Sequence, residues 1–246
     1  MRYSEFIQIK GSNIVDDIIK QGFAYVNSKL FFINATIIKD TIIFINSYSD
    51  LIVDKYVLEK KGYPYRKRKY SSFTLDRKTL SLIKNDPMPF FQSQSINNVY
   101  GGFNREFSSI SNSILENKFL NELILLDFLH LPTKFTNQYK KFFVGVHMFR
   151  IEPSTFYAGL PSPEGIHQDG HDFVIQHMIN KVNIKGGVSS IYSLAEKNIA
   201  SLTLNFFLDS IYVNDQKVKH DVTSIHLQNK KESGFRDMLI IDFEAI

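Results

Sequence analysis

The spacing of apolar residues divides the chain into a mixed first half and a strand-rich second half. Apolar side chains recur at helical intervals over residues 13–20 and 110–129, which predicts two helices with an apolar face. A further short helix is expected over residues 50–61, because the glycine that follows can end it. Runs of β-branched and aromatic residues predict strands over residues 23–26, 30–38 and 41–45.

The second half changes character at residue 142. Short β-rich segments follow one another there, with Gly, Pro, Asn and Asp residues in the gaps. No regular amphipathic helices separate them, which disfavours a parallel α/β sheet and favours a β-sandwich or jelly roll. Since no repeat or linker interrupts the chain, we expect one domain (1–246), with a helical and mixed half (1–141) packed on the jelly-roll core (142–246). The core strands are expected over residues 142–151, 172–179, 199–208, 218–225 and 238–243.

Composition narrows the possible chemistry. Of the 246 residues, 43% are hydrophobic, which is enough for a sizeable core, and none is cysteine. Disulfide scaffolds, thiolate metal sites and cysteine nucleophiles are therefore excluded, and any metal must be bound by His, Asp, Glu or backbone oxygen. No apolar run approaches the ~20 residues that a membrane span needs, and no export segment is visible. We expect a cytoplasmic protein that does not bind membranes.

The positive charge of the chain is local. Residues 60–69 contain six Lys and Arg residues and no acid, and these six more than account for the net charge of +4. Aromatic residues are interleaved with them, as in proteins that bind nucleic acids. The same composition also occurs in half-buried edge strands whose Lys head groups remain in water. The second interpretation is favoured, because the rest of the chain is not basic.

One motif among the seven histidines has the spacing of a metal site. His167 and Asp169 are two positions apart, so on an extended backbone both side chains reach the same side. His220, in another expected strand, can supply a third ligand. Two imidazoles and one carboxylate leave open coordination positions, which suits Fe(II) and oxygen chemistry. The alternative is a surface histidine beside a turn aspartate, because a lone His-x-Asp arises readily by chance.

An arginine that could bind an anionic cosubstrate follows these three residues in the sequence. Arg236 opens the strongly apolar segment 238–243. An Fe(II) enzyme that uses 2-oxoglutarate as cosubstrate needs a cation for the carboxylate that lies far from the metal. The planar guanidinium of Arg236 could pair with both oxygens of that carboxylate. The alternative is an exposed arginine paired with Asp237 or Glu232. The order of His167, Asp169, His220 and Arg236 favours the first interpretation.

The segment around the motif resembles the iron-site segment of a bacterial family of Fe(II)/2-oxoglutarate-dependent dioxygenases, the L-isoleucine hydroxylases and related free-amino-acid hydroxylases. The similarity covers roughly residues 60–243 and is loose in the first third. One departure is the lack of a proline shortly after His220, which leaves His226 as a competing third ligand. The stretches that carry the resemblance are residues 161–170, 144–151, 183–187 and 234–241, together with Gln94-Ser95, Asn98, Gly101-Gly102 and Arg105-x-Phe107.

The resemblance implies a double-stranded β-helix (α+β, mainly β, cupin-like) with N-terminal helices on the outside. It implies His167, Asp169 and His220 as iron ligands and Arg236 as the 2-oxoglutarate ligand. The implied reaction consumes O2, decarboxylates 2-oxoglutarate to succinate and CO2, and hydroxylates a free L-amino acid. Glu164 is a candidate for binding the substrate ammonium group, and Arg105 for binding its carboxylate.

Other functions stay open from the sequence. The same chemistry could act on a peptide-bound or carrier-bound residue or on a nucleobase. The chain could also be a non-enzymatic β-sandwich that binds nucleic acid through residues 60–70. The sequence does not predict the oligomeric state, the amino acid or the carbon that is hydroxylated.

Overall fold

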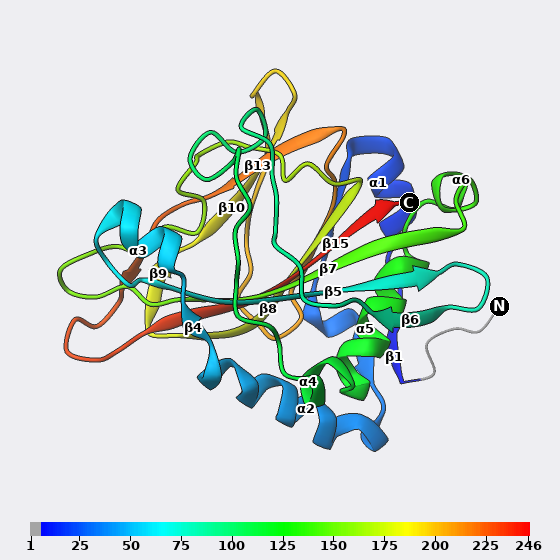
Figure 1. The fold of residues 1–246 in the computed structure, drawn as a ribbon, viewed down its shortest axis with the longest axis horizontal. Coiled ribbons are helices and arrows are strands. Elements are labelled where there is room, and N and C mark those ends of the chain that lie inside the picture. Colours follow the sequence, from blue (N-terminus) through cyan, green and yellow to red (C-terminus); the bar gives the residue numbers. More distant parts are fainter. Residues whose placement is uncertain (1–5) are drawn as a thin grey trace.

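The computed structural model describes residues 6–246, and its centre is an eight-stranded antiparallel sheet (Figure 1). Its four longest strands lie side by side, so most of their backbone groups are paired within the sheet. Along the sheet the order is β2 (Phe23–Val26), β12 (Ser210–Asn214), β8 (Phe173–Val182), β15 (Phe235–Ala245), β7 (Lys141–Ile151), β5 (Arg66–Asp76) and β4 (Ile52–Val53), with β6 (Ser81–Lys84) also on β5.

Shorter strands make a second β layer. One group has the order β11 (Asn198–Thr203), β10 (Val188–Ser193), β13 (Val218–Val222), and the other pairs β14 (Ile225–Leu227) with β9 (Ile184–Gly186). Along the chain, β8, β12 and β15 belong to the large sheet, and the strands between them belong to the second layer. This alternation is that of a double-stranded β-helix, so the expected fold class is confirmed.

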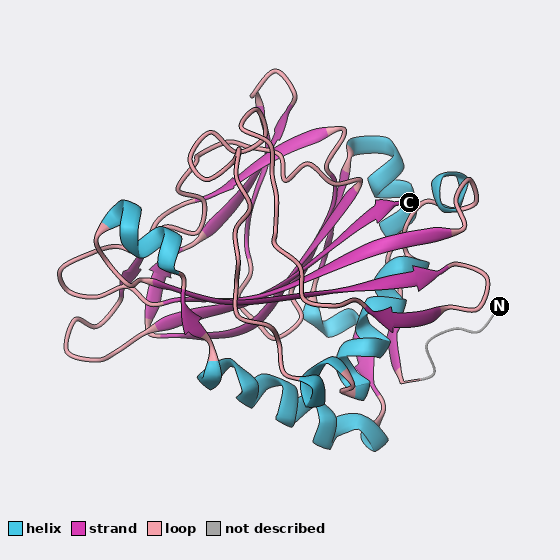
Figure 2. Ribbon diagram, in the orientation of Figure 1, coloured by secondary structure: helices cyan, strands magenta, loops and turns pink. Residues whose placement is uncertain are grey.

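Helices and short N-terminal elements cover the outer face of the large sheet (Figure 2). Phe119 and Leu123 of α5 share one apolar core with Ile175 of β8 and Leu239 of β15. Successive side chains of a strand point to opposite faces of the sheet. Alternate residues of these strands therefore pack in this core, and the residues between them face the second layer.

The remaining elements are α1 (Ile14–Gln21), α2 (Ile38–Asn46), α3 (Lys55–Lys61), α4 (Asn112–Leu115), α5 (Lys118–Leu129), α6 (Thr133–Thr136), β1 (Ile7–Ile9), β3 (Phe31–Ile33) and the 3-10 turns Ser28–Leu30, Ala35–Ile37 and Ser47–Asp50.

The strands expected over residues 30–38 and 41–45 are largely wrong. Only β3 forms there, and Ile38–Asn46 is the helix α2. Phe44 packs on Phe119 of α5 with ring centroids 5.3 Å apart, whereas Ile42 stays 53% exposed. Isoleucines on both sides of this helix hide its 3.6-residue period, and packing on α5 overrides their β propensity.

Other boundaries differ for local reasons. The helix expected over residues 110–129 is two helices, because Asn117 caps α5 by accepting the backbone N–H of Leu120. The helix expected over 50–61 begins only at Lys55, where the Asp54 carboxylate accepts two backbone N–H groups, and it ends at left-handed Gly62. The strand expected over 199–208 ends at Thr203, and the one expected over 218–225 is split into β13 and β14.

No helix within residues 6–246 is long and apolar enough to cross a membrane. Residues 1–5, at which no export segment is expected, lie outside the described part.

Candidate active site

A pocket lies between the large sheet and the second layer. Inward-facing residues of β5, β7, β8 and β15 form one wall, and β13 forms part of the opposite wall. Two connections complete it, residues 85–111 between β6 and α4 and residues 152–172 between β7 and β8. The pocket therefore draws on both halves of the chain.

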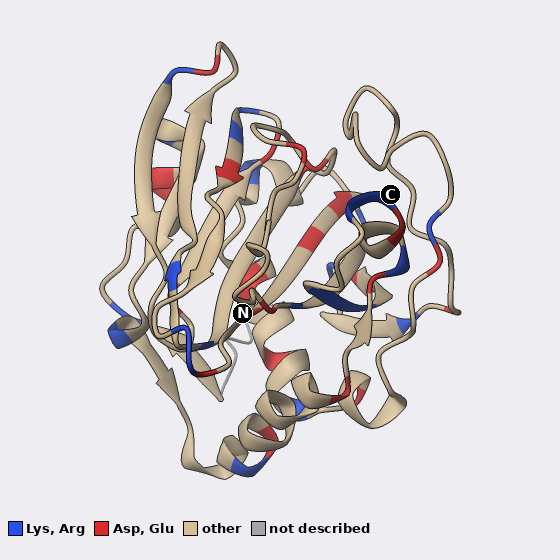
Figure 3. Cartoon of the chain, turned by 90° about the vertical axis from the view of Figure 1, so that its left-hand side faces the viewer, with Lys and Arg blue, Asp and Glu red and all other residues tan. Residues whose placement is uncertain are grey.

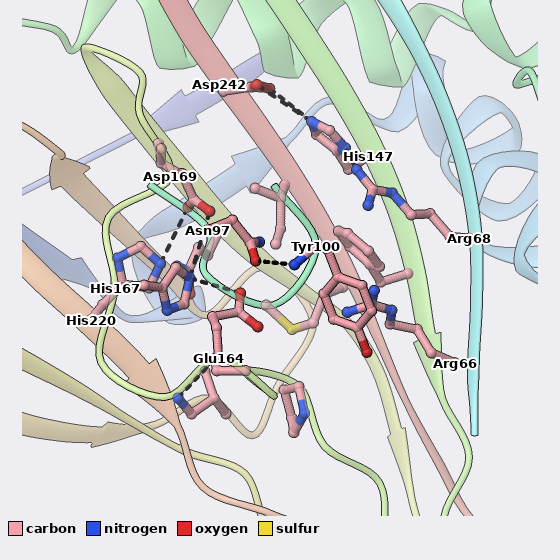
Figure 4. Close-up of a pocket in the computed structure, with 18 of the residues that line it drawn as sticks. Arg66, Arg68, Asn97, Tyr100, His147, Glu164, His167, Asp169, His220 and Asp242 are labelled. Carbon is pink, nitrogen blue, oxygen red and sulfur yellow. Dashed lines mark hydrogen bonds and ion pairs between the residues drawn. The ribbon is translucent and has the colours of Figure 1, made fainter. Parts of the chain in front are cut away.

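The three expected metal ligands meet at one end of this pocket (Figure 4). His167 and Asp169 lie in the β7–β8 connection, and His220 lies on β13. The backbones of His167 and His220 pair through two N–H···O bonds of 3.0 and 2.9 Å. Asp169 Oδ2 is 3.2 Å from His220 Nε2, Asp169 Oδ1 is 3.6 Å from His167 Nε2, and one donor atom from each residue lies within 4.8 Å of the others. These atoms could bind one cation.

Burial opposes protonation of His167, but Asp169 and Glu164 outweigh it and raise the pKa of this imidazole to about 9, so a bound cation would take the place of that proton. His167 Nδ1 donates to the Gly165 carbonyl at 2.8 Å, so Nε2 is the ring nitrogen that faces Asp169. Burial opposes ionisation of Asp169, but His220 and His167 outweigh it and lower the pKa of that carboxyl well below its usual value. Two imidazoles and a carboxylate on one side of a pocket are the donor set of non-haem Fe(II) sites.

His226, the competing third ligand, lies elsewhere. The chain turns between β13 and β14, so the two histidines do not share one straight strand. The His226 side chain is exposed, and its Nε2 lies 3.0 Å from Ser224 Oγ. The structure brings His220, and not His226, to His167 and Asp169.

The ligand loop is fixed by two residues that sequence reasoning missed. The buried Asp215 carboxylate accepts backbone N–H groups of Asp169 (3.0 Å), Gly170 (2.7 Å) and His171 (3.2 Å). Gln92 donates from Nε2 to the Asp169 carbonyl at 2.9 Å. In the sequence, Asp215 looks like an ordinary turn residue after Asn214, so only the fold reveals its role.

Arg236 lies in the same pocket with an uncompensated charge. It is 3% exposed, and among the described residues its Nε and Nη2 have no hydrogen-bond partner. Burial lowers its pKa to about 10, which leaves it charged at neutral pH. Asp237, the expected alternative partner, is instead bound by Arg150 through two bonds of 2.7 Å. A buried cation without a counterion is costly, so the site fits an anionic ligand.

The two candidate substrate residues also line the pocket. Glu164 Oε1 is 3.4 Å from His167 Nε2, and Glu164 Oε2 is buried with no partner in the described chain. Arg105 donates from Nη2 to Gln92 Oε1 at 2.6 Å. Because Gln92 also bonds the Asp169 backbone, Arg105 is linked to the metal-ligand loop through one residue.

The basic segment is not the half-buried edge strand that the sequence favours. Lys67 and Lys69 alternate with Arg66 and Arg68, whose side chains are buried and line the pocket. Strand β7 covers one edge of β5, and β4, β6 and backbone bonds from Tyr70 to Ser108 and from Asn85 to Ser72 cover the other. Basic and acidic residues are interspersed over the side of the molecule drawn in Figure 3. The alternation of Arg66, Arg68 and Tyr70 was the available signal for an inward face.

His147 of β7 is buried and has a polar partner at each ring nitrogen. Its Nδ1 lies 2.6 Å from Arg68 Nη2, so it accepts from the guanidinium. Its Nε2 lies 3.2 Å from the Asp242 carboxylate. Gly145 is required beside this pair, because a Cβ there would overlap the Asp242 carboxylate.

Known proteins resemble this chain over most of its length. The family model for 2OG-Fe dioxygenases matches residues 45–242. The L-isoleucine-4-hydroxylase of Bacillus thuringiensis is 28% identical over 194 residues, which are 78% of this chain and 80% of that protein.

Two crystal structures share the fold. The bsmA homolog of Methylobium petroleophilum PM1 has a TM-score of 0.79 at 23% identity, covering 94% of this chain and 92% of its own. IDO of Bacillus thuringiensis has a TM-score of 0.78 at 22% identity, covering 98% and 99%. The family match confirms the resemblance found in the sequence, and the chain belongs to the 2OG-Fe dioxygenase family.

Proposed function

We propose that this enzyme hydroxylates the side chain of a free L-amino acid, with succinate and CO2 as the products of 2-oxoglutarate. Its family uses Fe(II), 2-oxoglutarate and O2. The observation that carries the proposal is the meeting of three ligand atoms, within 4.8 Å of one another, in the pocket that also holds the unpartnered Arg236 guanidinium.

The residues have distinct roles in this proposal. His167, Asp169 and His220 would hold Fe(II), which when bound activates O2 with electrons from 2-oxoglutarate and supplies the oxidant for a C–H bond. Arg236 would bind the far carboxylate of 2-oxoglutarate with its planar fork. Met238 and Ile240, the next inward residues of β15, present an apolar wall that limits water beside the cosubstrate.

The substrate class rests on the relative and on the pocket walls. The matched hydroxylase acts on L-isoleucine, and the pocket here combines Ile151, Val174 and Val222 with polar side chains. Glu164 would bind the substrate ammonium group, since its free carboxylate oxygen is buried without a partner among the described residues. Arg105 would bind the substrate carboxylate. An aliphatic L-amino acid fits this combination.

Succinate release tests the proposal. The enzyme is incubated with Fe(II), ascorbate and 2-oxoglutarate, and each of the twenty free L-amino acids is added in turn. We expect one class, the aliphatic amino acids, to stimulate succinate release and to gain one oxygen atom by mass spectrometry. Stimulation by none of the twenty, in enzyme shown to bind iron, would refute the free-amino-acid substrate.

A further inference from the structure

Two buried guanidinium groups in the pocket have no counterion. Arg68 is 5% exposed and Arg105 is 2% exposed, and no carboxylate of residues 6–246 lies within ion-pair distance of either. The Nε atom of each is buried with no hydrogen-bond partner in the described chain. Their neighbour Arg66 differs, because it forms an ion pair with Asp54 at 2.8 Å.

These two charges lie around the same aromatic rings. The guanidinium carbons of Arg68 and Arg105 are each 4.9 Å from the centre of the Phe90 ring. They lie 3.9 and 5.8 Å from the centre of the Phe107 ring. Burial, followed by the charge of Arg105, lowers the pKa of Arg68 to about 9, and burial lowers that of Arg105 to about 10. Both stay protonated at neutral pH, so the two like charges repel each other, and a bound anion would relieve that repulsion.

We propose that Arg68 and Arg105 together bind one carboxylate, the free α-carboxylate of the substrate, and thereby exclude substrates whose carboxyl group is in an amide bond. This inference rests on the proposed amino-acid substrate and adds Arg68 as a specificity-determining residue. Arg236 is left for 2-oxoglutarate. In Figure 4, Arg66 and Arg68 enter the pocket from the side opposite His167 and His220. The Arg68 side of the proposed carboxylate site therefore lies opposite His167 and His220.

Neighbouring residues orient both guanidinium groups. His147 accepts from Arg68 Nη2 at 2.6 Å and is itself held against Asp242. Gln92 accepts from Arg105 Nη2 at 2.6 Å and donates to the Asp169 carbonyl. The link through Gln92 fixes the position of Arg105 relative to the loop that carries His167 and Asp169. A fixed distance between the carboxylate site and the metal site would decide which carbon of a small substrate is hydroxylated.

Anaerobic calorimetry with Fe(II) and 2-oxoglutarate present tests this without turnover. The probes are L-isoleucine, L-leucine and L-methionine, each compared with its C-terminal amide, which keeps the side chain and ammonium but loses the carboxylate. The variants are Arg68→Met and Arg105→Met. Lys69→Met is the matched control, because it removes the same charge from the same strand on the opposite face.

We expect wild-type enzyme and Lys69→Met to bind at least one of the acids about 30-fold more tightly than its amide. In Arg68→Met and Arg105→Met this preference should fall to about threefold or less, through weaker binding of the acid. Arg68→Lys and Arg105→Lys, which keep the charge but lose the fork, should be intermediate. The affinity for 2-oxoglutarate should stay within about twofold in every variant, which also reports that each variant is folded.

Two failures can be told apart. If wild-type enzyme prefers the acid and both methionine variants keep that preference, the two-arginine site is wrong while the proposed function stands. If wild-type enzyme binds Fe(II) and 2-oxoglutarate but none of the three amino acids, the aliphatic amino-acid substrate is wrong, and the inference fails with it.

Discussion

The carboxylate of Asp215 illustrates how single residues outside the ligand set shape the metal site. It accepts three consecutive backbone N–H groups beginning at Asp169, and so fixes the backbone that carries this proposed metal ligand. Substitution of residues that hold a metal ligand in place commonly weakens metal binding.

Asp215→Asn should therefore weaken Fe(II) binding by about 10- to 100-fold. The amide has one acceptor oxygen and cannot accept all three N–H groups as the carboxylate does. Anaerobic Fe(II) titration measures the effect, with Asp221→Asn as control, since Asp221 follows His220 directly and, within residues 6–246, its carboxylate accepts one hydrogen bond, from the Tyr192 hydroxyl. Equal Fe(II) affinity in wild type and Asp215→Asn would show that the loop is held without this carboxylate.

His147 gives the stability of the protein a dependence on pH. Burial lowers the pKa of His147, the carboxylate of Asp242 on β15 raises it, and the charge of Arg68 on β5 lowers it further. The imidazole of His171 contacts the same Asp242 carboxylate and also lowers the pKa of His147. Below the ordinary pKa of about 6.5, the unfolded chain binds a proton at this residue that the folded chain does not. The free energy of unfolding should therefore fall as the pH drops from about 6.5 toward the folded pKa.

His147→Gln should remove this component, because a neutral amide can accept from Arg68 and donate to Asp242 at every pH. Urea unfolding at pH 7.5 and at pH 5.5 measures it: wild type should lose more stability on acidification than the variant. Parallel losses would mean that His147 does not carry the effect.

Sequence identifies local sites better than distant ones. His167 and Asp169 are found because two positions on one extended backbone share a side, and Arg236 because it opens an apolar strand. Asp215 is 46 positions from Asp169, and Gln92 is 77 positions from it. Their roles depend on which turns and loops the fold brings together, and no spacing in the sequence encodes that.

At the scale of elements, a buried polar cluster joins helix α5 to the outer face of the large sheet. Asp127 of α5 accepts from the Tyr212 hydroxyl of β12 at 2.6 Å and pairs with His177 Nε2 of β8 at 2.8 Å. The sequence shows α5 and the strands through their apolar periods. It does not show this cluster, because an Asp inside an apolar helix and a His inside an apolar strand give no sign that they meet.

Tyr212→Phe should lower the free energy of unfolding by about 1.5–3 kcal/mol, because it removes a buried hydrogen bond to a charged group. Urea denaturation measures this, with Tyr25→Phe on β2 as control, since the Tyr25 hydroxyl accepts an exposed hydrogen bond from Asn27 rather than donating to a buried carboxylate. Affinity for Fe(II) should not change, because the cluster lies on the face away from the pocket. A loss no larger than that of Tyr25→Phe would assign the cluster no stabilising role.

At the scale of the molecule, the two halves of the chain build one site. The second half supplies the three proposed metal ligands and Arg236 to the pocket, and the first half supplies Arg66, Arg68, Gln92 and Arg105 through β5 and the connection that follows β6. The Tyr48 hydroxyl also donates to the Met238 carbonyl of β15 at 3.1 Å. We propose on this basis that the chain works as a single domain.

The central claim is that His167, Asp169 and His220 bind one Fe(II) and that Arg236 binds 2-oxoglutarate beside it. Anaerobic titration with Fe(II) and then with 2-oxoglutarate tests it most directly. Wild type should bind one Fe(II) per chain, Asp169→Ala and His220→Ala should bind it at least about 100-fold more weakly, and Arg236→Gln should keep Fe(II) but bind 2-oxoglutarate at least about 30-fold more weakly. Fe(II) binding at wild-type affinity in both alanine variants, or unchanged 2-oxoglutarate binding in Arg236→Gln, would contradict the claim.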